Sequence, residues 1–548
     1  MTLKGLLLFC LVYVAAGKHV KIDKESPVLK WPPTYSLEAT KYYMSSGLIE
    51  NFKYWRSSRN SRLEANNGAV IKIAIGTKKG YGKYEIHPET TEEETNKMVC
   101  TKIKEMLVRP ENFLPTIGDL NKQEGTENIR GIDCVKFTNA GETRPENEKT
   151  LWAYADNGTA YWIPVRYKTK EVDDWHGYLN NYEIWDFDNF NKDIDLDVFK
   201  MTYNCSNKEN DEKASSKSSD NYLLTLNAED ITAFDDAFST YVRQFGKQYA
   251  NKEEREMRKR NFYKSWRLVT STNNKNLGYK LTLNKLSDRI DEEISKYRRP
   301  KSDKPKTGSI PFPYTIEEIK KIANTLPKEY DLRVEGLVGP VSDALNEGCE
   351  SDWAFAVTAV VEGALARSNG GTWMKLSEQA LIDCSWGHGN KGCKGGSPTK
   401  SYSWIMEYGL PLQQEYGTYT NKNGFCKMKN MTKTYKIKGY TDVIPNSVDA
   451  LKIALINHGP ISVNLNGGYG LMLYDGGILY DELCDVSDVG DEEEKIPMTL
   501  VGYGEKDGDT FWILKESNSP YWGIDGYVYI SARNNNCGVM NEATYAIA

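Results

Sequence analysis

In this 548-residue chain basic residues do not outnumber acidic ones, and long apolar runs are lacking. Lysine and arginine number 70 against 76 aspartates and glutamates, a formal net charge of −6. Because phosphate binding needs a basic face, this balance argues against nucleic acid as the main partner. The apolar run near the N-terminus is shorter than the ~20 residues that a membrane span requires, and no later run is long enough. We therefore expect a protein without a membrane span.

The first 17 residues have the three parts of a secretory signal peptide. Lys4 supplies the positive start, Leu6–Val14 the apolar centre, and Ala15-Ala16-Gly17 the small residues of a cleavage site. A membrane anchor is the alternative, which the short apolar centre argues against. We expect a protein that follows the secretory pathway and is either secreted or lysosomal.

The remaining cysteines fit that route. Removal of Cys10 with the signal leaves nine, most of which should pair in an oxidising compartment. Cys100 and Cys134 are the expected partners in the N-terminal part, which leaves Cys205 as the odd cysteine. Three glycosylation sequons, which chance also produces, begin at Asn157, Asn204 and Asn430.

The length predicts about three or four domains. Residues 30–205 are β-rich, with strand patterns at Ala69–Ile75, Tyr84–His87, Ile132–Phe137 and Tyr161–Tyr167 and a tight-turn signal at Asp156-Asn157-Gly158. His87 and His176 have no other candidate catalytic or ligand residue near them in the sequence, and such histidines are more often surface or core residues than ligands. Residues 206–222 are polar and Ser-rich, which predicts a flexible linker.

Helical patterns follow in residues 223–297. Phe234, Phe238, Tyr241 and Phe245 recur at helical spacing, and a second, highly charged helix comes next. An ordinary amphipathic helix is the simplest explanation of that second pattern. Residues 298–324, which begin with Arg298-Arg299, are expected to be an exposed tether, and 325–548 a compact domain with helices first and short strands after.

At this point the residues match a known family. The C-terminal domain resembles papain-like cysteine peptidases through eight stretches in the family's order: Gly339-Pro-Val, Trp353-Ala-Phe-Ala, Leu376-Ser-Glu-Gln, Asp383-Cys-Ser, Gly392-Cys-Lys-Gly-Gly, Gly459-Pro-Ile-Ser-Val, Val501-Gly-Tyr-Gly and Trp522-Gly-Ile-Asp-Gly-Tyr. The resemblance implies an α+β fold with a helical lobe and a β-barrel-like lobe. It also implies three disulfides: Cys349–Cys393, Cys384–Cys426 and Cys484–Cys537.

The two preceding regions carry resemblances of their own. Residues 223–297 are similar to the family's inhibitory propeptide: one helix motif falls on Glu254, Arg258, Phe262, Val269 and Asn273, with Ser265 where Asn is usual, and a second motif falls on Asn284, Leu286 and Asp288. The β-rich region resembles the extra domain of a two-part group of insect members, through Trp31-Pro-Pro-Thr-Tyr and Pro164-Val-Arg-Tyr.

The family's chemistry needs a Cys thiolate, a His base, an Asn that orients the base, and a Gln that binds the oxyanion. Position by position, the resemblance places Asp352 at the nucleophile, Ile496 at the base and Glu516 at the orienter. The oxyanion position holds Asn346, and the Trp that shields the orienter is replaced by Asn518. The two histidines of the domain, His388 and His458, are not at the position of the family's base.

We therefore predict a secreted pseudopeptidase that binds a peptide or protein without cleaving it, with no cofactor and no metal. Gly395 and Gly396 are the expected peptide-binding positions, and a papain-like peptidase is one expected partner. One alternative is an unconventional hydrolase in which Asp352 and Glu516 share a proton. The others are a cation site that adds the acidic run 485–494, and an inert structural or storage role.

Overall fold

The computed structural model describes most of the chain, and the structural statements below concern these residues: 29–44, 48–77, 80–106, 113–115, 120–123, 125–139, 148–156, 159, 161–172, 179–207, 228–249, 251–289, 308–342, 349–482, 484, 495–517 and 519–548. The predicted signal peptide lies outside them, as do residues 208–222 of the linker, His176 and Arg298-Arg299. Among the described helices, none is both long and apolar enough to cross a bilayer.

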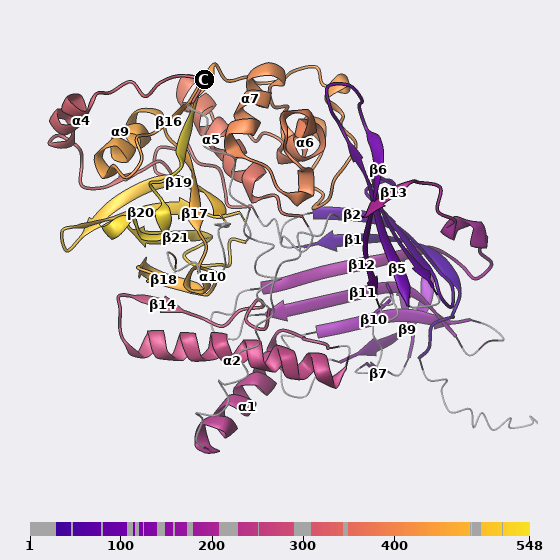
Figure 1. Ribbon diagram of the computed structural model, residues 1–548. Helices are drawn as coiled ribbons and strands as arrows, with labels where there is room; N and C mark the ends of the chain where they lie inside the picture. The colour runs from indigo at the N-terminus through magenta and orange to yellow at the C-terminus, as the bar shows by residue number, and fades with distance from the viewer. Residues whose placement is uncertain are drawn as a thin grey trace, which may run out of the picture.

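The N-terminal region forms one large sheet (Figure 1). Its strands are β1 (Tyr35–Tyr43), β2 (Leu48–Arg56), β3 (Ser61–Ala65), β4 (Val70–Gly76), β5 (Tyr81–Glu89), β6 (Lys97–Met106), β7 (Asn121–Lys122), β8 (Glu127–Ile129), β9 (Ile132–Thr138), β10 (Glu148–Ala155), β11 (Trp162–Val172), β12 (Leu179–Asn191) and β13 (Cys205–Asn207), with the 3-10 turn η1 (Leu196–Phe199). The order is β13-β6-β5-β4-β3-β2-β1-β12-β11-β10-β9-β7, with β8 on β9. The four predicted strand patterns fall on β4, β5, β9 and β11 and are confirmed.

Alternation along the strands explains how this sheet builds its largest core. In β2, residues 48, 50, 52, 54 and 56 are buried and the residues between them are largely exposed, the period-2 pattern of a half-buried strand. The inward side chains of β1, β2 and β12 meet in an aromatic cluster in which Phe52 stacks on Trp185 at 5.7 Å. This packing fixes the register, because a slip of one residue would turn the aromatic side chains outward.

The disulfide of this region corrects a prediction. Cys100 is bonded to Cys205, not to Cys134, so the expected Cys100–Cys134 pair is wrong. Strand β13 lies parallel to β6 and places Cys205 opposite Cys100, with 4.5 Å between the Cα atoms. Cys134 is in β9, near the other end of the strand order, where its thiol is buried and free.

Two helices and a short strand follow: α1 (Ala228–Gln244), α2 (Lys252–Asn274) and β14 (Tyr279–Leu281). The predicted aromatic face of α1 packs on α2, with the Tyr241 and Phe262 ring centroids 4.5 Å apart. The side chain of Asn251 caps α2 by accepting the backbone N–H of Glu254 at 2.8 Å. These aromatic contacts give the segment a small core of its own.

The C-terminal domain has two lobes. The helical lobe contains α5 (Asp352–Ser368), α6 (Glu378–Cys384), α7 (Pro398–Tyr408), α8 (Gln413–Tyr416) and the turns η4 (Ser385–His388), η5 (Gly392–Lys394) and η6 (Met428–Asn430). Helix α5 is buried nearly all round, as its run of alanine, valine and aromatic residues predicts. It is therefore the axis on which the other helices of this lobe pack.

The second lobe is a mixed sheet with helices on its outside. Its elements are β15 (Tyr330–Asp331), β16 (Gly439–Asp442), α9 (Val448–His458), β17 (Ile461–Asn466), α10 (Tyr469–Met472), β18 (Tyr474–Leu479), β19 (Lys495–Lys506), β20 (Asp509–Lys515), β21 (Tyr527–Ser531), η7 (Arg533–Gly538) and β22 (Ala543–Ile547). The order is β14-β18-β21-β20-β19-β17-β22-β16, with β15 on β19, so β14 extends this sheet from outside the domain.

The tether differs from expectation in its second half. Residues 316–323 form a helix, α4 (Ile316–Ala323), which packs on α9 and buries Ile319 in the core of the β lobe. A capping box starts it: Thr315 and Glu318 each accept the backbone N–H of the other. The exposed tether was predicted from the Pro- and Lys-rich first part of the segment, and the capping box of the second part was not recognised.

The three disulfides implied by the resemblance are all present in the C-terminal domain: Cys349–Cys393, Cys384–Cys426 and Cys484–Cys537. Figure 1 shows the N-terminal sheet beside the helical lobe, and α2 below β14 and the adjoining strand β18 of the β lobe. The two lobes meet where α5 contacts β19.

Candidate functional site

The helical side of the cleft begins at Asp352, the first residue of α5. Its N-cap is Ser351, and the next residue, Trp353, is completely buried and fixes this end of the helix. Asp352 is only 6% exposed, and its Oδ1 accepts the hydroxyl of Ser517 from the other lobe at 3.3 Å. A carboxylate in the first turn of a helix is also stabilised by the helix dipole.

The β-lobe side carries the other two predicted positions. Ile496 lies in β19 opposite Leu465 of β17 and packs against the core of its lobe. Glu516 follows β20, its backbone N–H donates to the carbonyl of Gly526 at 3.0 Å, and it is 5% exposed. Asn346 and Asn518 lie outside the described residues.

A cavity of about 20 Å³, room for one water molecule, joins Asp352 and Glu516. Its lining is Ser342, Asp352, Phe355, Ala356, Ala359, Glu362, Lys375, Glu378, Pro497, Met498, Thr499, Lys515, Glu516 and Ser517. The structure thus brings two of the three predicted positions to one cavity. Ile496 directly precedes the segment that lines it and is not itself part of the lining.

The same cavity is also lined by buried charged residues that were not predicted from the sequence. Lys375 forms ion pairs with Glu378 and, at 3.4 Å, with Glu362, whose Oε1 also accepts the backbone N–H of Leu376 at 2.8 Å. A lone glutamate inside the apolar helix α5 was the available signal, because a charge in a fully buried helix is rare unless paired.

The pKa values of these groups follow from their burial. Burial raises the pKa of Glu362, against the attraction of Lys375. Burial also opposes the charge on Lys375, but the carboxylates of Glu362 and Glu378 outweigh it and raise the pKa of that amine. For Lys515, burial prevails and lowers the pKa to about 8, while its Nζ donates to the carbonyl of Gly339 at 3.0 Å.

The histidines of the domain lie away from this cavity. The Nε2 atom of His388 lies 3.3 Å from a carboxylate oxygen of Glu407. His458 stacks on Tyr545 at 4.6 Å, and burial lowers its pKa, which favours the neutral ring. In the N-terminal sheet, His87 is completely buried against Trp386, as expected of a core residue.

Gly395 and Gly396 are glycines for steric reasons. Gly395 has φ +102°, a conformation that other residues avoid. A Cβ on Gly396 would stand 2.6 Å from the Trp353 ring. The two glycines therefore hold this loop against the start of α5, next to Asp352.

The prodomain-like segment is attached to the β lobe by backbone pairing. Strand β14 pairs antiparallel with β18, and the side-chain amide of Asn284 donates to the carbonyl of Met472 at 2.8 Å. Asp288 is buried and accepts the hydroxyls of Tyr241 and Tyr249 and the amine of Lys247. Asn284 thus links the segment to the peptidase-like domain, whereas Asp288 holds the helices of the segment together.

Other predicted sites are more simply placed. Asn204 and Asn430 are exposed, as carriers of a glycan must be, and Asn157 lies outside the described residues. Within the described chain, no three His, Cys, Asp or Glu side chains gather in a way that would hold a metal ion. The acidic run 485–494 also lies outside it.

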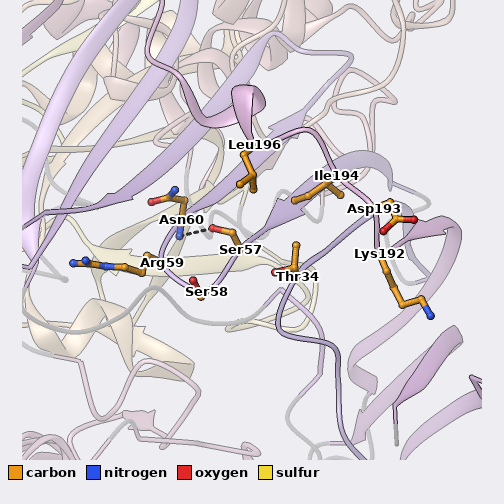
Figure 2. A pocket seen from close by; sticks show the side chains of 9 residues that line it. All are labelled: Thr34, Ser57, Ser58, Arg59, Asn60, Lys192, Asp193, Ile194 and Leu196. Atoms are coloured by element: carbon orange, nitrogen blue, oxygen red, sulfur yellow. Dashed lines mark hydrogen bonds between the residues drawn. The ribbon is translucent and has the colours of Figure 1, made fainter. Parts of the chain in front are cut away.

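A second cavity, of about 710 Å³, lies in the N-terminal sheet (Figure 2). It is lined by Thr34, Ser57, Ser58, Arg59, Asn60, Lys192, Asp193, Ile194 and Leu196. Its two cations are engaged: Arg59 donates to the carbonyl of Thr77 at 2.8 Å and Lys192 pairs with Asp156 at 2.6 Å. The cavity is larger than the one in the cleft, and its lining contains hydroxyl groups but no histidine or cysteine.

A two-lobed domain with its cleft at the start of a buried helix, preceded by a helical segment paired to the β lobe, defines a peptidase-type fold with an attached prodomain. A family model described as papain family cysteine protease matches residues 326–547, and one for the cathepsin propeptide inhibitor domain (I29) matches 238–294. The chain belongs to the papain family of cysteine proteases. Neither family model reaches the N-terminal sheet.

Named relatives share the C-terminal part of the chain. Cysteine proteinase 2 of Zea mays is 32% identical over 315 residues, 57% of this chain and 83% of that protein. Procathepsin L of Rattus norvegicus is 32% identical over 324 residues, 56% of this chain and 90% of that protein. Among solved structures, digestive procathepsin L 3 of Tenebrio molitor larval midgut has 29% identity and a TM-score of 0.48, over 57% of this chain and 99% of that one.

Proposed function

We propose that this protein is a secreted or lysosomal papain-family pseudopeptidase that binds a peptide or protein in its cleft without cleaving it. The observation that carries the proposal is the set of residues at the three catalytic positions of the family motif: Asp352, Ile496 and Glu516. A carboxylate is a far poorer nucleophile toward an amide than a thiolate, and an isoleucine accepts no proton.

The retained scaffold supports binding. The bridge Cys349–Cys393 joins the segment before Asp352 to the loop of Gly395 and Gly396. In the family this loop lets a peptide backbone approach, and this chain has glycine at both positions. A stretch that keeps its shape after its chemistry is lost is expected to serve recognition.

The decisive experiment restores the lost groups. The natural protein, freed of its prodomain, and the variant Asp352→Cys/Ile496→His/Glu516→Asn are assayed on fluorogenic peptides from pH 3 to 8. We expect a silent natural protein and a variant that cuts and is stopped by a thiol-directed inhibitor. The matched control Asp352→Ser with the same two other changes has no thiol and should be silent.

A second candidate is an unconventional hydrolase that uses Asp352 and Glu516, because both line one cavity. Paired carboxylates can share a proton and perform acid–base chemistry. If the natural protein cuts peptides and resists thiol-directed inhibitors, Asp352→Asn and Glu516→Gln should each abolish the activity. That result would replace the binding proposal. A protein that neither cuts nor retains any peptide from a random library is instead an inert structural or storage protein.

An active papain-like peptidase is a further proposed partner, through the prodomain-like segment. The segment has its own aromatic core and pairs with a β lobe through β14. The isolated segment 223–297 should inhibit papain-like enzymes at micromolar concentration, and a full-length chain with its β14 engaged should inhibit far less. No inhibition by the isolated segment would remove this partner.

A further inference from the structure

One short segment of the helical lobe, residues 419–424, contacts both the N-terminal sheet and the wall of the cleft. The segment lies between α8 and η6 and contains no acidic residue. Its contacts on the two sides come from neighbouring residues, so a displacement on one side has to be met on the other.

The sheet holds this segment with buried polar groups. The side-chain amide of Asn66, in the β3–β4 turn, donates to the hydroxyl of Thr420 at 3.1 Å and to the carbonyl of Asn423 at 3.4 Å. Glu50 of β2 forms an ion pair with Lys422 in which the two side chains are 5% and 18% exposed. The Lys422 amine also stands 4.9 Å from the centroid of the Phe52 ring. Groups so poorly hydrated need these partners, so the contact is specific.

The other side of the segment holds the cleft wall. The hydroxyl of Tyr419 is hydrogen-bonded to that of Ser351 at 2.6 Å, and Ser351 is the N-cap residue directly before Asp352. The side-chain oxygen of Asn423 accepts the backbone N–H of Cys393 at 2.8 Å, two residues before Gly395. The start of α5 and the glycine loop are thus both held by this one segment.

The segment has little room to move between its neighbours. The carboxylate of Asp383 accepts the backbone N–H of Gly424 at 2.6 Å, and Gln379 accepts that of Thr420 at 2.8 Å. A Cβ on Gly424 would lie 2.9 Å from Asn66 of the sheet and 2.9 Å from Asp383 of α6. Close-packed groups of this kind transmit a displacement instead of absorbing it.

We infer that the N-terminal domain is a regulatory domain that sets the conformation of the cleft wall through residues 419–424. A ligand bound to the N-terminal domain would thereby change what the cleft binds, and by linkage a ligand in the cleft would change binding at the domain. The inference rests on the proposed function only in taking the cleft to be a binding site. Asn60, which lines the cavity of Figure 2, precedes β3, and Asn66 follows it, so that cavity and the contact lie at the two ends of one strand.

The test is amide hydrogen exchange of the full chain with two matched variants. Asn66 and Asn67 stand in the same turn with φ +52° and +55°, and of these two only Asn66 has a side-chain hydrogen bond to the helical lobe among those of the described residues. Glycine accepts both conformations, so Asn66→Gly removes the contact and Asn67→Gly repeats the backbone change without it. We expect Asn66→Gly to speed exchange at residues 351–357 and 393–396 by a factor of about three to ten, the range that a lost hydrogen bond corresponds to. Asn67→Gly should leave both segments unchanged.

Two results would overturn the inference. One is faster exchange confined to residues 48–68 and 418–426, which would mean that the contact joins the two domains without affecting the cleft wall. The other is an equal effect of the two variants, which would mean that the backbone change, and not the loss of the Asn66 contact, speeds the exchange. If Asn66→Gly does not fold, Glu50→Gln is measured against Glu148→Gln, which breaks the ion pair with Lys168 outside this contact. Exchange is measured without ligand, so the outcome does not depend on whether the natural protein cuts peptides.

Discussion

The ion pair between Glu50 and Lys422 offers the sharpest test of how the N-terminal sheet is held on the helical lobe. The Glu50 carboxylate also accepts the hydroxyl of Tyr43 at 2.9 Å, and burial lowers the pKa of Lys422 against the pull of Glu50. Both charges are therefore desolvated, and each depends on the other.

Removing one partner should cost much more than removing both. Lys422→Met leaves a buried carboxylate with the Tyr43 hydroxyl, a loss of about 3 kcal/mol from the 3–5 kcal/mol typical of a broken buried pair. The double change Glu50→Met/Lys422→Met replaces the pair by apolar groups and should lie within about 1 kcal/mol of the natural protein. In calorimetry the single variant should melt lower by about 6–12 °C and the double variant by about 4 °C or less.

The double-mutant cycle decides between the two explanations of this contact. A loss for Lys422→Met that exceeds the loss for the double variant by about 2–3 kcal/mol means that the pair is desolvated as described. A cost below about 1 kcal/mol for Lys422→Met would mean that the pair is solvated like an ordinary surface ion pair, and the reasoning on the interface would be refuted.

Three further predictions concern other buried groups. Burial raises the pKa of Asp383 to about 7, above the ~3.9 of the unfolded chain, so the folded protein binds this proton more tightly. The free energy of unfolding should therefore fall by about 2–4 kcal/mol as the pH rises from 4 to 7. In urea unfolding measured across this pH range, Asp383→Asn should not show that fall. Gly396→Ala should destabilise the domain by about 2–3 kcal/mol in urea unfolding, because its Cβ meets Trp353 at 2.6 Å, whereas Gly476→Ala, with nothing within 4 Å, should be nearly neutral; equal effects would contradict the steric explanation. Burial raises the pKa of the Cys134 thiol, so a maleimide should label it only after unfolding, and rapid labelling of the native protein would contradict its placement in the sheet.

Much of the fold could be predicted because it is written in local patterns. The aromatic spacing of Phe234, Phe238 and Tyr241 predicts the buried face of α1, and alternation predicts β4 and β9. The three disulfides of the C-terminal domain were instead implied by the family resemblance, which rests on the order of the motifs, and the structure has all three. Local periodicity and an ordered motif set are both readable along the chain without knowledge of distant contacts.

What the sequence did not reveal depends on contacts between distant residues. The partner of Cys100 follows from β13 lying beside β6, a parallel pairing across 105 residues that no spacing rule gives. Lys515 of β20 reaches the charges of Glu362 and Lys375 only because the two lobes meet. The contact of Asn66 with residues 419–424 spans two domains. In each case tertiary packing, not local preference, selects the partner.

The bridge between Cys100 and Cys205 has an evolutionary consequence. It closes a loop of 105 residues near the end of the N-terminal domain, for which loop-closure entropy corresponds to about 4.7 kcal/mol. The four bridges of the described chain each lie within one domain, so none ties the sheet to the peptidase-like part. A unit that carries its own cross-link can be gained, lost or exchanged in gene fusions without disturbing the cross-links of its neighbour. The polar contact surface is then the feature that a lineage must keep for the two parts to act together.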